Sequence, residues 1–279
     1  KARKTVYAAL ESGELDLAIG THALLSEGVT FAKLGLVVTD EQHRFGVGQR
    51  AALAAKANGT PHVLVMSATP IPRTLALIIY GDLDVSVVDE LPPGRSPVET
   101  YVVGEDKRQR MYNFVRKLVG EGRQVYMVCP AVEEGEADGE EPGPGGPAAD
   151  LKAAVTYAQT LQTQVFPDLR VGLVHGKMKS KEKDAVMTAF AAGKLDVLVS
   201  TTVIEVGVDV PNAALMIVEN ADRFGLSQLH QLRGRVGRGK HQSYCVLVTS
   251  TRSQDSRERL RVLSKTNDGF KIAEEDLRL

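Results

Sequence analysis

The sequence predicts a doubly wound α/β architecture, in which parallel strands alternate with helices. Two observations carry this prediction. Short apolar runs end in polar or small residues, as buried parallel strands do when their carboxyl ends carry the chemistry, and helical patterns separate these runs. The predicted strands are Leu15–Thr21, Leu34–Glu41, His62–Thr69, Val98–Val103, Gln124–Pro130, Val171–Gly176, Leu195–Thr201, Ala214–Asn220 and Ser243–Thr249.

The stretch between Ser180 and Gly193 is typical of the helices between these strands. Ser180 suits the N-cap, and Gly193 suits the left-handed position that ends many helices. Val186, Met187 and Phe190 share one face at helical spacing. We therefore expect a helix here.

Length and composition exclude several classes of protein. A chain of 279 residues with 43% hydrophobic and 25% charged residues is an ordinary globular sequence of one large or two small domains. No apolar run approaches the ~20 residues of a membrane helix, and the first ten residues lack the apolar core of a signal peptide. Cys129 and Cys245 lie in apolar runs, so we expect buried free thiols in a cytoplasmic protein and no disulfide framework.

The net charge of -1 conceals a basic body. The Gly- and Pro-rich stretch Glu133–Asp150 predicts a disordered surface loop, and its segment Glu133–Glu141 holds six acids and no base. Without these six charges the chain carries +5. Basic residues cluster late in the chain, either as a phosphate-binding surface or as a solvated helix face. They are Arg233, Arg235, Arg238, Lys240, Arg252, Arg257, Arg259, Arg261 and Lys265.

Asp40-Glu41-Gln42-His43 directly follows an apolar strand. Adjacent carboxylates at a strand's carboxyl end suit a Mg²⁺–phosphate site, where one holds the metal and its neighbour accepts a proton from the attacking water. A solvated strand-end turn is the alternative. A transition-metal site is disfavoured because no second His or Cys lies at ligand spacing.

Two further segments have the residue types of a phosphate site. Ser67 and Thr69 end another apolar run, where their hydroxyls suit a neighbouring carboxylate, a phosphate or the cap of the next helix. In the segment Gln231–Gly239, glycines flank Arg235 and Arg238. Arginine forks on a backbone that can approach a ligand closely favour recognition of a transferring phosphoryl group over a plain basic loop.

Five segments occur in the order of a known motor family. GTHALL, DEQHRFGV, SATPIPRT, STTVIEVGVDVPNA and QLRGRVGRG resemble motifs Ib, II, III, V and VI of superfamily 2 helicases. Together with YGDLDVSVVDELPPGR, they most closely resemble the RecG family of ATP-dependent DNA helicases, which remodel replication forks and other branched DNA. The transcription-repair coupling factor Mfd shares the HRFGV and ATPIPRT pieces and is a less close match.

The resemblance implies a role for each matching residue. Asp40 would coordinate Mg²⁺ and Glu41 would activate the hydrolytic water. Gln42, His43, Ser67 and Thr69 would couple the nucleotide state to DNA contacts, and ATP would also meet Gly207, Asp209, Gln231, Arg235 and Arg238. Candidate DNA contacts are Thr21, His22, Ser200, Thr201 and Thr202, which suit phosphates, and Phe45, which either stacks on a base or packs under its own loop.

The resemblance also implies RecA-like parallel sheets, with a partial first helicase lobe in residues 1–92 and a complete second lobe in residues 98–250. Leu91–Pro97 would join them, and residues 251–279 would begin a helical translocation element. No Gly-x-x-x-x-Gly-Lys-Ser/Thr loop occurs, and the chain starts at Lys1. We therefore expect a fragment that is inactive alone and that lacks the wedge domain and the rest of lobe one, taken from a monomeric, cytoplasmic protein.

Two other functions remain open at this point. A non-catalytic nucleic-acid-binding or regulatory module that reuses the second lobe would bind DNA in a salt-sensitive manner without responding to nucleotide. An Mfd-like repair translocase would need an RNA-polymerase-binding region, about which this chain is silent.

Overall fold

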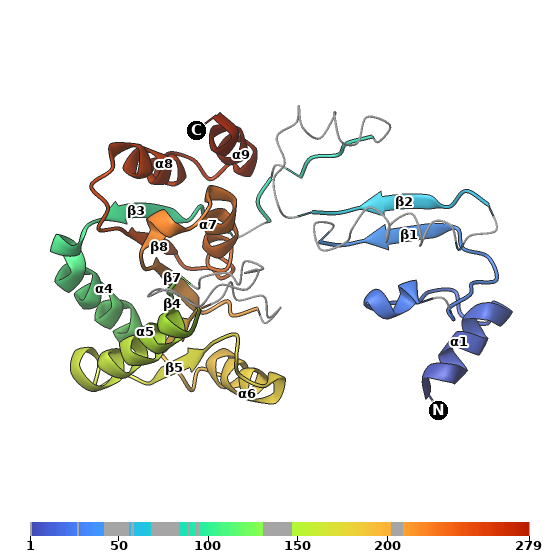
Figure 1. Ribbon diagram of the computed structural model, residues 1–279, viewed down its shortest axis with the longest axis horizontal. Helices are drawn as coiled ribbons and strands as arrows, with labels where there is room; N and C mark the ends of the chain where they lie inside the picture. Colours follow the sequence, from blue (N-terminus) through green and yellow to red (C-terminus); the bar gives the residue numbers. More distant parts are fainter. Residues whose placement is uncertain are drawn as a thin grey trace, which may run out of the picture. The chain divides into compact units, whose positions relative to one another are not determined.

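The computed structural model describes residues 2–26, 28–41, 56, 59–67, 84–88, 90–92, 95–130, 147–201 and 209–278. The chain divides into two compact units, Lys1–Pro70 and Ile71–Leu279, which are described separately below. We call them the first and the second unit. Their elements are labelled in Figure 1.

The first unit holds two short parallel strands. Helix α1 (Ala2–Ser12) and the 3-10 turn η1 (His22–Leu25) precede strands β1 (Leu36–Thr39) and β2 (His62–Val65). The strands pair in register from Leu36 opposite His62 to Thr39 opposite Val65. Both predicted strands are therefore present, although each is shorter at its ends than the sequence suggested.

The strand predicted at Leu15–Thr21 is wrong. These residues have no strand structure, and the side chains of Leu17 and Ile19 are 76% and 92% exposed. A strand needs a partner for its backbone N–H and C=O groups, and β1 pairs only with β2 among the described residues. An apolar run without a partner strand or a covered face does not become a strand.

The second unit is built on a six-stranded parallel sheet in the order β3-β8-β7-β4-β6-β5. Helices follow or precede its strands in the alternation that the sequence predicted (Figure 1). The strands are β3 (Glu99–Val103), β4 (Gln124–Val128), β5 (Val171–Val174), β6 (Val197–Ser200), β7 (Ala213–Val218) and β8 (Tyr244–Val248). The helices are η3 (Glu105–Lys107), α4 (Arg108–Gly120), α5 (Pro147–Thr160), the π-helical η4 (Leu161–Val165), α6 (Ser180–Ala191), η5 (Ala221–Arg223), α7 (Leu226–Arg233), α8 (Gln254–Lys265) and α9 (Gly269–Arg278).

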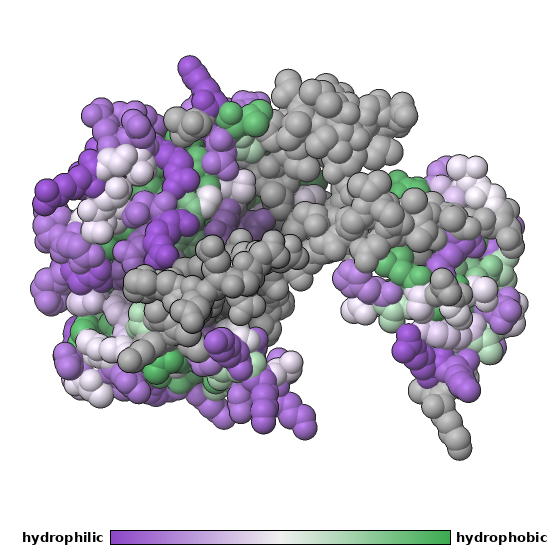
Figure 2. Space-filling model, in the orientation of Figure 1, coloured by the Kyte–Doolittle hydropathy of each residue, from purple (hydrophilic) through white to green (hydrophobic). Residues whose placement is uncertain are grey.

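Both faces of this sheet are covered. Alternate side chains of a strand point to opposite faces, so Met127 of β4 joins the core under α4 and α5, whereas Tyr126 joins the core under α6, α7, α8 and α9. Strands β4 and β7 are buried throughout. Burial of this kind stabilises by about 25 cal/mol for each Å² of apolar surface. On the face shown in Figure 2 the described surface of this unit is mostly hydrophilic.

The helix predicted at Ser180–Gly193 is confirmed as α6, but its cap is not Ser180. The helix begins at Ser180, and Lys179 is the N-cap residue, whose backbone N–H donates to a carboxylate oxygen of Glu182 (3.1 Å). A Glu three residues after the cap satisfies this exposed donor better than a hydroxyl inside the helix. Gly193 has a φ of +71°, as predicted.

The structure confirms the remaining predictions about the chain's organisation only in part. Residues 131–146 lie outside the described residues, and α5 already begins at Pro147, so the loop predicted to reach Asp150 is too long by four residues. Proline suits a first helical position because its missing N–H has no partner there. Cys129 and Cys245 are buried free thiols, as expected. No helix in the described part of the chain is long and apolar enough to cross a membrane.

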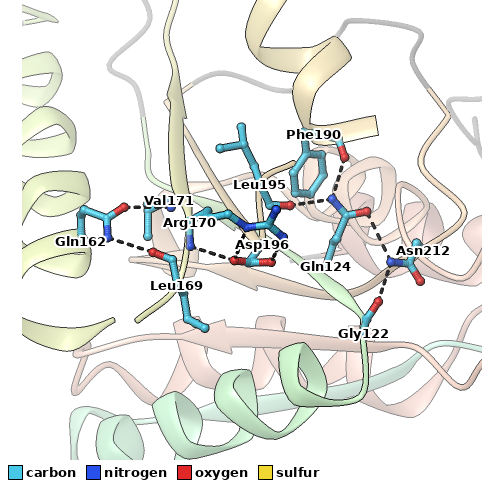
Figure 3. Close-up of polar contacts among 10 residues, drawn as sticks. All are labelled: Gly122, Gln124, Gln162, Leu169, Arg170, Val171, Phe190, Leu195, Asp196 and Asn212. Atoms are coloured by element: carbon cyan, nitrogen blue, oxygen red, sulfur yellow. Dashed lines mark hydrogen bonds and ion pairs between the residues drawn. The ribbon is translucent and has the colours of Figure 1, made fainter. Parts of the chain in front are cut away.

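A polar network closes the amino-terminal edge of the sheet (Figure 3). Gln124, at the start of β4, donates through Nε2 to the carbonyls of Phe190 (2.6 Å) and Leu195 (2.7 Å). Asn212, just before β7, donates to the carbonyl of Gly122 (2.7 Å). These bonds from side chains to backbone carbonyls connect the loops on this edge of the sheet.

Candidate functional site

In the first unit, candidate residues from two motifs lie at the same sheet edge. Asp40 and Glu41 follow β1, and Ser67 follows β2 by two residues. The parallel pairing continues past the strands, because the N–H of Met66 donates to the carbonyl of Thr39 (2.8 Å). The carboxylates and the hydroxyl therefore emerge at the carboxyl ends of adjacent strands, as the sequence predicted.

The backbone at Glu41 is unusual. Its φ is +50°, in the left-handed region that non-glycine residues rarely adopt at a cost of roughly 1 kcal/mol. The N–H of Glu41 donates to Oδ1 of Asp40 (2.8 Å), which compensates in part for this conformation. The side chain of Asp40 is exposed, so its second oxygen can take a further ligand.

Thr21 and His22 lie at the N-terminus of η1 in the same unit. Both residues are exposed, and the Thr21 side chain makes no capping hydrogen bond to η1. An exposed hydroxyl at the start of a helical turn suits contact with a phosphate.

In the second unit, the predicted phosphate contacts at the end of β6 are less accessible. Ser200 is fully buried and Thr201 is 6% exposed. Their backbones continue the sheet: the Ser200 carbonyl accepts from the N–H of Cys129 (2.8 Å), and the Thr201 N–H donates to the carbonyl of Val174 (3.3 Å). In this conformation little of either side chain is available to a phosphate.

The segment after α7 carries the two predicted phosphate-binding arginines. Arg238 forms an ion pair with Asp209 (Nη1 to Oδ1, 3.3 Å), and its Nε donates to the carbonyl of Gly234 (3.2 Å). Arg235 is half-buried. Burial raises the pKa of the Tyr126 hydroxyl to about 12, and the positive charges of Arg235 and Arg238 act against that rise. The structure therefore brings Arg238 together with Asp209, and the charges of both arginines act on the hydroxyl of Tyr126.

Arg233, which the sequence placed in the same basic cluster, has a different environment. It is 3% exposed, and its Nη1 donates to the carbonyls of Leu263 (2.7 Å) and Thr266 (3.0 Å) at the end of α8. Its Nη2 contacts Nδ1 of His230 (2.9 Å). A buried guanidinium that satisfies helix-end carbonyls binds α7 to α8 and is not a surface cation.

The glycines between the arginines are needed by the protein itself. Gly237 has a φ of +79°, and a Cβ on it would lie 2.8 Å from Cγ2 of Val98. A Cβ on Gly239 would lie 2.3 Å from the carbonyl oxygen of Pro211. From the sequence alone, we expect these glycines to allow close approach of a ligand. In the structure they allow close approach of the chain to residues 98 and 211, which fixes where Arg238 stands.

The sequence did not predict one network of charged and polar side chains, which is centred on the buried carboxylate of Glu219. Arg108, at the start of α4, forms two hydrogen bonds with Glu219, the residue after β7 (2.8 and 2.9 Å). Tyr157 of α5 donates to the same carboxylate (2.6 Å), and burial followed by the Glu219 charge raises the pKa of Tyr157. No spacing signal links positions 108, 157 and 219. The network fixes the turn from which η5 and α7 continue.

Several predicted site residues lie outside the described residues. These are Gln42, His43, Phe45, Thr69, Thr202 and Gly207. Gln231 is half-buried in α7, next to the arginine segment.

Comparisons with known proteins place this geometry in one family. Residues 107–240 match the family model of the helicase conserved C-terminal domain. The ATP-dependent DNA helicase RecG of Synechocystis is 57% identical over 277 residues, which are 99% of this chain and 32% of that protein. RecG of Bacillus subtilis is 50% identical over 279 residues, 100% of this chain and 39% of that protein. A solved structure of RecG bound to a three-way DNA junction is 47% identical with a TM-score of 0.75, covering 99% of this chain and 34% of that one.

Over nearly its whole length the chain is similar to a segment of RecG proteins. It spans about a third of the length of the curated RecG proteins it matches. A more distant structure, yeast Dbp5 bound to RNA and ADP BeF3, has a TM-score of 0.55 at 15% identity and covers 96% of this chain and 62% of that one. That likeness concerns the fold alone, the RecA-like parallel sheet with flanking helices that the resemblance implied.

Proposed function

We propose that this chain is the motor portion of an ATP-dependent DNA helicase or translocase that remodels branched DNA, such as replication forks and Holliday junctions, in recombination and repair. The 57% identity to Synechocystis RecG carries the proposal, because an alignment of 277 residues includes the segments with Asp40 and Arg238. The protein would act as a monomer in the cytoplasm, where it would meet its DNA. Its activity would also require the other regions that RecG proteins have.

The first unit would supply the carboxylates for ATP hydrolysis. Asp40 would hold the Mg²⁺ that accompanies ATP, and Glu41 would take a proton from the attacking water. No cluster of three or more metal-binding side chains occurs among the described residues. This fits Mg²⁺, which commonly uses one or two protein carboxylates and otherwise waters and phosphates. The exposed carboxylate of Asp40 meets that requirement.

The second unit would neutralise the phosphates. The ion pair of Arg238 with Asp209 is partly exposed at both side chains (29% and 55%), so it is worth less than about 1 kcal/mol. A triphosphate carries more negative charge than Asp209 and would compete well for the guanidinium. Arg235 and Gln231, on either side of the turn after α7, would complete the contacts with the nucleotide.

DNA contacts would come from both units. Thr21 and His22 are exposed and suit the phosphate backbone directly. Ser200 and Thr201 would contribute after a local rearrangement that exposes them, since both are buried at the end of β6. Phe45 would contribute by stacking and Thr202 by a further backbone contact.

The test is a chimera in which this chain replaces the matching segment of Synechocystis RecG. We expect ATP hydrolysis that is stimulated by a three-way DNA junction, together with unwinding of that junction. In the same chimera, Glu41→Gln is expected to lower the hydrolysis rate by roughly 100-fold or more, since it removes the proton acceptor. Arg238→Ala should have an effect of similar size, since it removes a transition-state contact.

Two results would contradict the proposal. A folded chimera without DNA-stimulated hydrolysis would refute the motor function of this chain. Full activity in both Glu41→Gln and Arg238→Ala would refute the site assignment while leaving the family function intact.

A further inference from the structure

Strand β5 is the last strand of the six-stranded sheet, and its outer side is an edge of that sheet. Within the described part of the chain β5 pairs only with β6, from Val171 opposite Val197 to Val174 opposite Ser200. The edge of a sheet presents backbone N–H and C=O groups to which another strand can bind. What satisfies these groups therefore decides whether a further strand can join the sheet.

The backbone groups of Leu169 and Val171 face this open edge. Arg170 lies between them, and its carbonyl accepts from the N–H of Val197 (3.2 Å), the first residue of β6. Successive residues of a strand direct their backbone groups to opposite sides, so the two neighbours of Arg170 direct theirs away from β6. Leu173 continues the same alternation, and its N–H faces the edge as well.

The side-chain amide of Gln162 occupies the place of a partner strand on this edge, as Figure 3 shows. Its Oε1 accepts from the N–H of Val171 (3.0 Å), and its Nε2 donates to the carbonyl of Leu169 (2.9 Å). A residue of a parallel neighbouring strand makes the same two bonds, one through its C=O and one through its N–H. The amide therefore stands in for one residue of a further strand, opposite Arg170.

The π-helical turn η4 holds Gln162 over the edge. The N–H of Phe166 donates to the carbonyl of Leu161 (2.6 Å), a bond that spans five residues instead of the four of an α-helix. Both of these side chains are fully buried, so the widened turn keeps them in the core while Gln162 faces β5. Arg116 of α4 fixes the end of the turn, because it donates to the carbonyl of Val165 and its guanidinium lies 5.3 Å from the centre of the Phe166 ring. The amide is thus in place before any partner approaches.

A second copy of the chain has the same edge, and the two edges fit each other. Two β5 strands related by a twofold axis run antiparallel, and Val171 can then lie opposite its own counterpart, where each N–H meets the other's carbonyl. Arg170, the exposed cation beside it, forms an ion pair with Asp196 (Nη2 to Oδ1, 2.6 Å), which reduces the repulsion between the copies. The amide of Gln162 holds the N–H of Val171 that such a pair needs.

We propose that Gln162 is a lock on the open edge of the sheet, which keeps β5 from pairing with the β5 of a second copy of this chain. Release of the amide leaves the N–H of Val171 and the carbonyl of Leu169 available to a further strand. The lock is built from residues of the second unit alone, and it does not depend on ATP hydrolysis or on DNA.

The test compares the self-association of the 279-residue chain with that of its variants by sedimentation velocity over a range of concentrations. Gln162→Ala removes the amide, and the matched control Gln164→Ala removes an exposed amide from the same turn. A double variant, Gln162→Ala with Val171→Pro, opens the lock and also removes the edge N–H at the first residue of the strand, where proline is tolerated. Circular dichroism checks folding. Gln162→Met, which removes the amide and keeps the length of the side chain, replaces Gln162→Ala if that variant does not fold.

Gln162→Ala is expected to associate roughly tenfold more tightly than the wild type, whereas Gln164→Ala stays within about twofold of it. The double variant should return to the wild-type value, because β5 then lacks the donor at the centre of the pair. Hydrogen exchange in the peptide that contains Val171 should be faster in dilute Gln162→Ala than in dilute wild type, since this N–H loses its acceptor. It should slow again at concentrations at which Gln162→Ala is paired.

Three results would overturn the proposal. Equal association of the wild type and Gln162→Ala would show that the amide excludes no partner. An equal increase in Gln164→Ala would show that the effect is not specific to Gln162. Tight association that persists in the double variant would show that the copies meet through a surface other than the β5 edge.

Discussion

Strand β1 of the first unit and strand β4 of the second read alike in the sequence and differ in the structure. Both are short apolar runs in parallel pairs, and both precede candidate functional residues or loops. Every residue of β4 is buried, whereas Leu36 and Val38 of β1 are 58% and 51% exposed. The residues of β2 are likewise exposed or half-buried.

The difference comes from what covers each sheet. In the second unit, helices on both faces supply two cores that bury alternate residues of the same strand. In the first unit, Leu10, Val29 and Val37 are the hydrophobic residues buried among those described. An apolar sequence run thus predicts that a strand can form, while the number of covered faces decides how much that strand stabilises. Side chains in the two units should therefore respond very differently to the same substitution.

The largest difference is expected for truncation of an apolar side chain. Phe190 of α6 is fully buried, with its ring centroid 4.9 Å from that of Tyr126. We expect Phe190→Ala to lower the free energy of unfolding by about 4 kcal/mol, through lost burial and the cavity left behind. Leu17→Ala in the first unit, where the side chain is 76% exposed, should change it by less than about 0.5 kcal/mol. Urea unfolding followed by circular dichroism measures both. Similar effects of the two variants would contradict the contrast between the units.

The next effect concerns a buried charge. Removing the carboxylate in Glu219→Ala would leave the hydroxyl of Tyr157 without its acceptor and would leave Arg108 with Glu105 as its carboxylate partner, and we expect a loss of about 3 kcal/mol. Asp106→Ala provides the matched control, because Asp106 pairs with Lys107 at the surface (3.1 Å, side chains 70% and 56% exposed). The control should cost less than about 0.5 kcal/mol. Equal losses in urea unfolding would mean that the network contributes no more than a surface pair.

A smaller loss of stability is expected where the backbone at Gly239 packs directly against the backbone at Pro211. Gly239→Ala would place a Cβ 2.3 Å from the carbonyl oxygen of Pro211, so the segment that carries Arg238 and Lys240 must shift, at a cost of roughly 2 kcal/mol. Gly35→Ala in the first unit meets nothing within 4 Å. It should change stability by less than about 0.5 kcal/mol. Thermal unfolding compares the two variants, and an unchanged midpoint for Gly239→Ala would show that this contact yields without strain.

The sequence predicted the parallel strands of both sheets, because an apolar run indicates a buried strand and its polar end indicates where the carboxyl end of that strand lies. It also placed Asp40, Glu41 and Ser67 at the carboxyl ends of strands, and the parallel pairing of β1 and β2 in the structure makes these ends neighbours. It did not predict that Arg233 is buried or that Arg108 meets Glu219, since those contacts join residues 30 and 111 positions apart in the chain. The false strand at Leu15–Thr21 has the same cause: local composition carries no information about which surface will cover a residue.

The smallest effect expected depends on pH and distinguishes a half-buried histidine from an exposed one. Burial, and secondly the charge of Arg233, lower the pKa of His230 to about 4 from a usual value near 6.5. The folded state therefore favours the neutral ring, so its contribution to stability is complete above pH ~6.5 and is lost as the pH falls toward about 4, on the order of 1–2 kcal/mol in all. His230→Asn keeps an acceptor near Arg233 but does not titrate, so the difference in unfolding free energy between wild type and variant should shrink over that pH range.

Carboxylates whose pKa is lowered by arginine, such as Asp196, act equally in both proteins and cancel in this difference. His62→Asn, at the exposed start of β2, is the matched control for this substitution. A constant difference between wild type and His230→Asn from pH 7 to pH 4 would show that the ring of His230 is protonated as readily in the folded as in the unfolded chain.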